Sequence, residues 1–348
     1  METGSPRLKH TLFLALAILI PLSIILCAAE LTTRYFDPQI RGKQGLQNPF
    51  WAHHPTRHHA LKPGDYADTI WGIFFHVNKL GFRGPEISKD KPQGTMRILC
   101  LGDSITMGSA LPEEAVYPRI VEGILLERYP GHRFEVINMG VSGYDIEEEH
   151  LQFKEEGLLL SPDAVVVQFC LNDVPSVEFV DLINPLRELD IPGKRFLLAH
   201  LALARFLRER YNRLGLKNAF LGVDHLFEMD PESPQAQRIE KGFSEYETRL
   251  REIASLCRKR GVRFLLLIVP HRAQFDDRRA RYIPQKRLIA LGRESGFDVL
   301  DLVPLFSSLE KLPYAFPDPV HPDPIGHKII AGAIVQWLES GIEDIPLK

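Results

Sequence analysis

Three residue types that together can transfer acyl groups, a serine, a histidine and an aspartate, occur at two distant places in this chain. Ser104 closes the turn Gly102-Asp103-Ser104 after an apolar run, and Asp318 lies three residues before His321 in a proline-bounded loop. A serine hydroxyl becomes a nucleophile when a base takes its proton, and an imidazole base works best when a carboxylate orients it. The pattern predicts Ser104 as nucleophile, His321 as base and Asp318 as the orienting acid.

Two other segments could supply hydrogen-bond donors for the oxyanion that forms when a serine attacks an ester carbonyl. Gly143 follows the apolar run 134–139, in a loop where a backbone amide can approach a substrate without interference from a Cβ atom. Asn172 follows the apolar run 164–170, and its side-chain NH2 group is a donor. We expect the Ser104 amide, the Gly143 amide and the Asn172 side chain to form an oxyanion hole.

The elements that must position these residues alternate between apolar β-type runs and helical stretches from residue 96 onward. This alternation predicts an α/β fold, in which a parallel sheet is covered by helices on both faces and chemistry gathers at the carboxyl ends of the strands. The predicted strands are 97–101, 134–139, 164–170, 262–269 and 297–302. The predicted helices lie near 116–129, 146–158, 241–260, 280–294 and 326–339.

Four blocks in this order resemble the SGNH hydrolase superfamily, also called GDSL-type esterases and lipases. The blocks are Gly102-Asp103-Ser104, Gly143, Asn172-Asp173, and Asp318 with His321. The resemblance covers about residues 95–340. It implies a three-layer α/β/α sandwich with a flavodoxin-like, parallel five-stranded sheet, acyl-serine chemistry, and neither a metal nor an organic cofactor.

One position departs from the family's pattern, because Cys170 replaces the glycine of the usual Gly-x-Asn-Asp block. Cysteine is small, so we expect a modest reshaping beside the oxyanion site. Asp103 and Asp173 are predicted to hold local backbone amides rather than to take part in catalysis. His327 is a rival base, but its helical context disfavours it.

The N-terminus predicts a membrane segment. Residues 11–29 carry no charge, and as a helix they would extend roughly 28 Å, enough to cross a bilayer. The run exceeds the usual apolar core of a signal peptide, which favours an uncleaved anchor; cleavage after Ala29 is the alternative, and lipidation of Cys27 is disfavoured. The anchor and the turn 80–85 resemble a membrane-tethered bacterial subgroup of the superfamily that is often associated with envelope polysaccharides.

Composition sets further bounds. The net charge of −3 and the lack of a zinc-type cysteine spacing or Walker loop argue against nucleic-acid binding. The paired histidines 53–54 and 58–59 are not expected to bind metal, and the four cysteines are predicted to be buried thiols rather than a disulfide framework. The predicted organisation is a short tail at 1–10, a transmembrane anchor at 11–29, a connector at 30–93, and a hydrolase domain at 95–345 with an insertion at 174–240.

These observations predict a serine esterase, held in the membrane by its N-terminal helix, with its catalytic domain on the periplasmic or cell-surface side. Its expected substrates are O-acyl groups on envelope carbohydrate or lipid, and no protein partner is predicted.

Two alternatives stay open. An O-acyltransferase would pass the acyl group to a surface polysaccharide, and a catalytically silent protein would only bind an envelope component. The basic, amphipathic stretch 196–216 is predicted to be a lid or surface helix, with contact to a membrane surface as the alternative.

Overall fold

The computed structural model describes residues 6–36, 50–68, 73–109, 111–175, 201–204, 207, 230–276, 281–308 and 320–341. The chain divides into two compact units, one made of 1–46 with 186–214 and the other of 47–185 with 215–348. The predicted site residues all fall in the second unit. Residues 196–214 of the predicted segment 196–216 belong to the first unit, and most of the segment lies outside the described residues.

The centre of the larger unit is a five-stranded parallel sheet with the strand order β6-β5-β7-β8-β9. Each predicted apolar run forms one strand, and all residues of β5 and β7 are buried, as expected for strands covered on both faces. The strands are β5 (Thr95–Leu101), β6 (Arg133–Asn138), β7 (Ala164–Phe169), β8 (Arg263–Ile268) and β9 (Asp298–Asp301).

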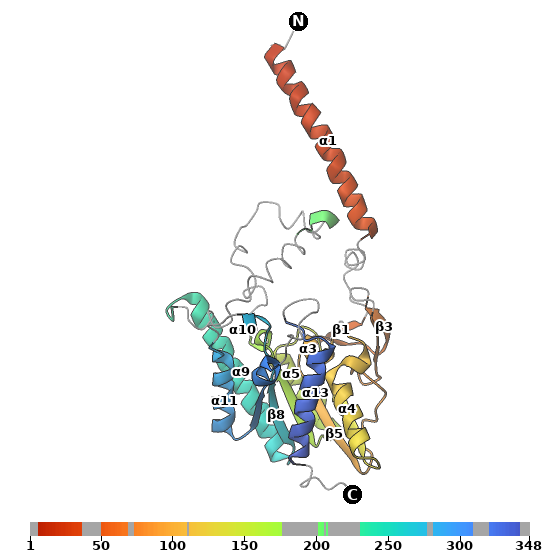
Figure 1. Cartoon of the computed structure of the whole chain (residues 1–348), viewed down its shortest axis with the longest axis vertical. Coiled ribbons are helices and arrows are strands. Elements are labelled where there is room, and N and C mark those ends of the chain that lie inside the picture. Colours follow the sequence, from red (N-terminus) through yellow and green to blue (C-terminus); the bar gives the residue numbers. More distant parts are fainter. Residues whose placement is uncertain are drawn as a thin grey trace. The chain divides into compact units, whose positions relative to one another are not determined.

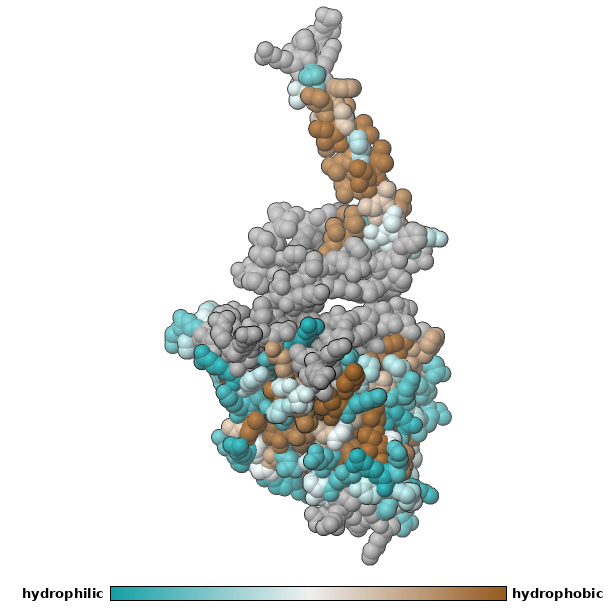
Figure 2. All heavy atoms as spheres, in the orientation of Figure 1, coloured by the Kyte–Doolittle hydropathy of each residue, from teal (hydrophilic) through white to brown (hydrophobic). Residues whose placement is uncertain are grey.

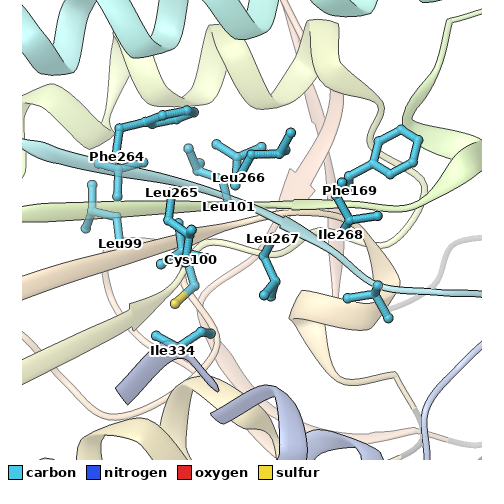
Figure 3. Packing of buried hydrophobic residues seen from close by; sticks show 14 of the residues in the cluster. Leu99, Cys100, Leu101, Phe169, Phe264, Leu265, Leu266, Leu267, Ile268 and Ile334 are labelled. Carbon is cyan, nitrogen blue, oxygen red and sulfur yellow. The ribbon is translucent and has the colours of Figure 1, made fainter. Parts of the chain in front are cut away.

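Helices cover the sheet in the connections between strands, which confirms the predicted α/β architecture (Figure 1). Helix α4 (Tyr117–Arg128) packs beside α13 (Pro324–Glu339), and α5 (Ile146–Glu155) packs beside α9 (Pro234–Lys259). Figure 3 shows helices above and below the sheet, with Ile334 of α13 close to Cys100 of β5. The other helices of this unit are α3 (Ser104–Met107), α10 (Ala273–Asp276), α11 (Ile283–Ser295), α12 (Val303–Ser307) and the 3-10 turns η1 (Glu113–Ala115), η2 (Gly157–Leu160) and η3 (Leu171–Asp173).

Two antiparallel hairpins from the predicted connector pack against the carboxyl end of the sheet. They are β1 (Trp51–His54) with β2 (His58–Leu61), and β3 (Gly64–Asp68) with β4 (Ile73–Val77). Their apolar side chains form a second small core with Met107, Val141 and Tyr144 of the main domain. Buried Arg83 follows the hairpins and donates hydrogen bonds to the carbonyls of Met107, Gly108 and Leu111. The connector therefore supports the segment that begins at Ser104.

Helix α1 (Pro6–Phe36) belongs to the smaller unit, and its residues Phe13–Tyr35 are long and apolar enough to cross a membrane. Its large apolar side chains are exposed in this structure, as the brown spheres along α1 in Figure 2 show. A signal sequence near an N-terminus has the same properties. Within this unit, the Glu30 carboxylate accepts hydrogen bonds from the backbone amides of Ala202 and Leu203, at 2.8 and 2.7 Å.

Candidate active site

Ser104 is held at the carboxyl end of β5 by the turn that precedes it. Gly102 has a φ of +154°, and a Cβ atom there would lie 2.1 Å from Thr106 Oγ1, so a side chain would not fit. Asp103 caps α3 by accepting a hydrogen bond from the Ile105 amide at 2.9 Å. Ser104 is therefore the first residue of a helix, with its hydroxyl at the edge where the parallel strands end.

The structure brings His321 to this hydroxyl from the loop before α13. His321 Nε2 lies 2.8 Å from Ser104 Oγ although the two residues are 217 positions apart. This is the distance at which an imidazole can take the serine proton. Asp318 lies outside the described residues, so its role in orienting His321 stays a prediction. The rival base His327 is buried, and its Nδ1 accepts the Tyr117 amide at 3.1 Å. Burial lowers the pKa of His327 to about 3.

Asn172 and Asp103 meet beside the nucleophile. Asn172 Nδ2 donates a hydrogen bond of 2.8 Å to Asp103 Oδ2, and the same oxygen lies 3.2 Å from Ser104 Oγ. A side-chain amide carries two hydrogens, so this bond fixes the Asn172 group while the second hydrogen stays available for a substrate oxygen. The prediction that Asp103 only holds local backbone is therefore incomplete, because the fully buried carboxylate also holds Asn172.

The loop that carries Gly143 runs beside the same turn. Val141 donates its amide to the Gly102 carbonyl at 3.1 Å. A Cβ atom on Gly140 would lie only 2.2 Å from the Met107 nitrogen, which explains a glycine at that close approach. Gly143 has a φ of +86°, in the left-handed region. Its exposed amide donates no hydrogen bond to any residue that the structure describes.

Cys170, the departure from the family's pattern, has a defined place in the structure. Its backbone carbonyl accepts the Asp173 amide at 3.0 Å, and its own amide donates to the Asp173 carboxylate, so residue 170 anchors η3, the turn that carries Asn172. The Cys170 sulfur lies 3.5 Å from His271 Nε2, which also accepts the Leu171 amide at 3.3 Å. The sequence prediction missed His271, although it follows the strand run 262–269 and so lies at the same sheet edge as the other site residues.

We expect Cys170→Gly, which restores the family's usual residue, to lower kcat for ester hydrolysis by roughly twofold to fivefold. Glycine loosens the backbone before the turn that carries Asn172, at a cost of about 0.5–1 kcal/mol, and the sulfur contact with His271 is lost. Cys170→Ser keeps a polar side chain that can contact His271 and should retain most of the activity. Steady-state kinetics of the two purified variants test this. A Cys170→Gly enzyme as active as the wild type would show that the thiol does not position Asn172.

Carboxyl groups lie behind the site, among them Glu149, which the sequence analysis did not single out. Glu149 of α5 and Asp173 of η3 are fully buried. Burial first, and then the charge of Asp103, raise the pKa of both groups well above the ordinary range. Both Glu149 oxygens are without a hydrogen bond to any described residue. Glu149 shares the helical spacing of the buried residues Ile146 and Phe153, a signal that could have placed it in the core.

Glu149→Gln should change how stability depends on pH. A glutamate has an ordinary pKa of 4.5 in the unfolded chain, and burial raises the pKa of Glu149 in the folded protein. The folded protein therefore binds this proton more tightly than the unfolded chain, so the contribution of Glu149 to stability falls as pH rises above about 4.5. Glutamine cannot ionise. The Tm of the variant relative to wild type should therefore rise between pH 5 and pH 8, by on the order of 2–4 °C. Thermal unfolding at both pH values measures this, with exposed Glu114→Gln as control. A constant difference would contradict it.

In the described part of the chain, no group of three or more His, Cys, Asp or Glu side chains is arranged to hold a metal ion. The histidines of the first hairpin make other contacts. Exposed His58 lies 3.7 Å from Glu148, and His54 contacts the buried Arg57 guanidinium.

Several comparisons connect this geometry with known proteins. The GDSL-like Lipase/Acylhydrolase family matches residues 100–329. A search of curated proteins found no match. Solved structures with a similar fold include TesA, with 15% identity, 70% of this chain and 99% of that chain covered, and a TM-score of 0.44. The acetylxylan esterase Axe2 from Geobacillus stearothermophilus has 21% identity, 69% and 93% coverage, and a TM-score of 0.42.

A parallel sheet of five strands with a serine–histidine pair at its carboxyl edge defines an α/β hydrolytic enzyme of the SGNH type. The chain belongs to the GDSL-like lipase/acylhydrolase family, whose match covers both Ser104 and His321. It is accordingly an enzyme that hydrolyses ester bonds.

Proposed function

We propose that this enzyme cleaves carboxylic esters through a covalent acyl-enzyme on Ser104. The observation that carries the proposal is the 2.8 Å contact between His321 Nε2 and Ser104 Oγ. In the first step the Ser104 oxygen attacks the ester carbonyl while His321 takes its proton. His321 then gives this proton to the leaving alcohol. Water, deprotonated by the same imidazole, attacks the acyl-serine and releases the acid.

The oxyanion formed in both steps would receive three hydrogen bonds, from the amides of Ser104 and Gly143 and from the side chain of Asn172. Support comes from the bond between Asn172 and Asp103 and from the free Gly143 amide described above. Asp318, three residues before His321, would orient the imidazole and stabilise its charged form.

The proposed setting is the outer face of a membrane. Helix α1 would serve as an uncleaved anchor, which its length and apolar surface support. The proposed substrates are O-acyl groups on envelope carbohydrate or lipid, in keeping with the resemblance of the anchor and the 80–85 turn to membrane-tethered members of the superfamily.

Fluorophosphonate labelling of the full-length protein in detergent tests the proposal, because the reagent needs an activated serine. Mass spectrometry should find the adduct on Ser104, and Ser104→Ala should neither be labelled nor turn over p-nitrophenyl acetate. A folded wild-type protein that stays unlabelled would favour a silent binding protein. Once labelling is established, incubation of an acyl donor with and without a glycan acceptor separates hydrolysis from acyl transfer: free acid in both reactions supports the esterase, and acylated glycan supports the transferase.

A further inference from the structure

A histidine of the N-terminal connector contacts the peptide bond that would supply one oxyanion donor. His59 Nε2, on β2, lies 3.0 Å from the carbonyl oxygen of Ser142, 83 residues away in the chain. A carbonyl oxygen only accepts hydrogen bonds, so Nε2 carries the proton and donates it. The Ser142 carbonyl and the Gly143 N–H belong to the same peptide plane.

The geometry of that plane links the two groups. In a trans peptide the C=O and the N–H bonds point in opposite directions, and the described chain contains no cis peptide. A donor that holds the Ser142 oxygen from one side therefore aims the Gly143 hydrogen toward the other. Without such a bond, a plane that ends at a glycine can rotate at low cost, because Gly143 has no side chain to oppose the motion and a Cβ atom there would meet nothing within 4 Å.

The imidazole of His59 is itself held in place. Its ring lies 4.7 Å from the Trp51 ring and 5.3 Å from the Tyr144 ring, measured between centroids. The Tyr144 hydroxyl also donates a hydrogen bond to the His59 backbone carbonyl. Tyr144 directly follows Gly143. The hairpin β1–β2 therefore contacts the loop that carries Gly143 on both sides of the 142–143 peptide bond.

We propose that His59 is a positioning residue for the oxyanion hole. This inference rests on the proposed function, in which the Gly143 amide receives the oxyanion. The Nε2–H bond orients the 142–143 peptide before substrate arrives, and it polarises the peptide so that its N–H becomes a better donor. The connector is then part of the catalytic site and more than a spacer between membrane and enzyme.

Kinetics of full-length variants test the proposal. His59→Ala should lower kcat for p-nitrophenyl acetate by about tenfold with KM changed less than about twofold, because the interaction matters only when the oxyanion forms. His59→Gln places an amide donor near the position of Nε2 and should recover most of the loss. The matched control is His53→Ala, since His53 is the exposed cross-strand partner of His59 on β1.

Stability is measured alongside, so that a folding defect is not read as a catalytic one. If His59→Ala unfolds, the comparison is made between His59→Gln and the similarly sized His59→Met, and a higher kcat for His59→Gln supports the proposal. The proposal is wrong if His59→Ala keeps the wild-type kcat while Ser104→Ala is inactive. If His59→Ala unfolds, the same result for His59→Met overturns the proposal. Activity that survives in Ser104→Ala would instead overturn the proposed function itself.

Discussion

Replacing His321 with alanine is expected to lower kcat by about 10⁴-fold or more, close to the loss in Ser104→Ala. The reason is that the Ser104 hydroxyl is a weak nucleophile without a base, and Nε2 of His321 is the nitrogen 2.8 Å from it. Because the two side chains act as one unit, the double variant should be no slower than the worse of the single variants. Steady-state hydrolysis of p-nitrophenyl acetate by the three variants measures this.

His327→Asn serves as the matched control for a histidine of the same segment. Its Oδ1 can accept the Tyr117 amide in place of Nδ1, and activity per folded molecule should stay within about threefold of wild type, since a surrogate acceptor preserves the local contact. If His321→Ala retained activity and His327→Asn lost it, His327 would be the base and His321 would not. Additive losses in Ser104→Ala and His321→Ala would argue against a shared proton transfer.

The sequence could predict the sheet and the placement of the site because both follow from short-range pattern. Short apolar runs such as 164–170 indicate buried strands in an alternating α/β chain, and the carboxyl ends of parallel strands share one edge of the sheet. Ser104 and Asn172 could be assigned from that rule together with the resemblance. The structure places them in the turns that directly follow the neighbouring strands β5 and β7, joined through Asp103.

The supporting contacts could not be predicted, because they depend on packing between distant segments. Nothing in the run of histidines near residue 59 indicates that one ring would reach the Ser142 carbonyl. The partnership of Cys170 with His271 joins residues 101 positions apart across two strands. Such contacts arise from how hairpins and turns lie on the finished sheet, whereas the sequence pattern reports only which residues face the core.

Asp103 shows how such packing changes the meaning of a motif. A capping aspartate before a short helix is common, and its bond to the Ile105 amide alone would be structural. The second carboxylate oxygen contacts both Ser104 Oγ and Asn172 Nδ2. The side chain therefore sets the distance between the two groups that, in the proposed mechanism, act on the same carbonyl, and a helix cap alone would not need this second contact.

Asn172→Ala is accordingly expected to lower kcat by about 10²–10³-fold with KM little changed, because the lost donor acts on the oxyanion and not on the ground-state ester. Asp103→Asn should cost less, about tenfold. An asparagine there has a single acceptor oxygen, so while it keeps the bond from the Ile105 amide it turns its NH2 group toward Asn172, and the bond between the two side chains is lost.

A double-mutant cycle decides whether Asp103 acts through Asn172. Once Asn172 is alanine, the carboxylate has no side-chain amide to hold, so Asp103→Asn should have a much smaller further effect on kcat. The contrary result, a full tenfold loss in both backgrounds, would assign Asp103 to the placement of Ser104 alone. Turnover of Asn172→Ala at the wild-type rate would remove this amide from the oxyanion hole and leave the two backbone amides as its donors.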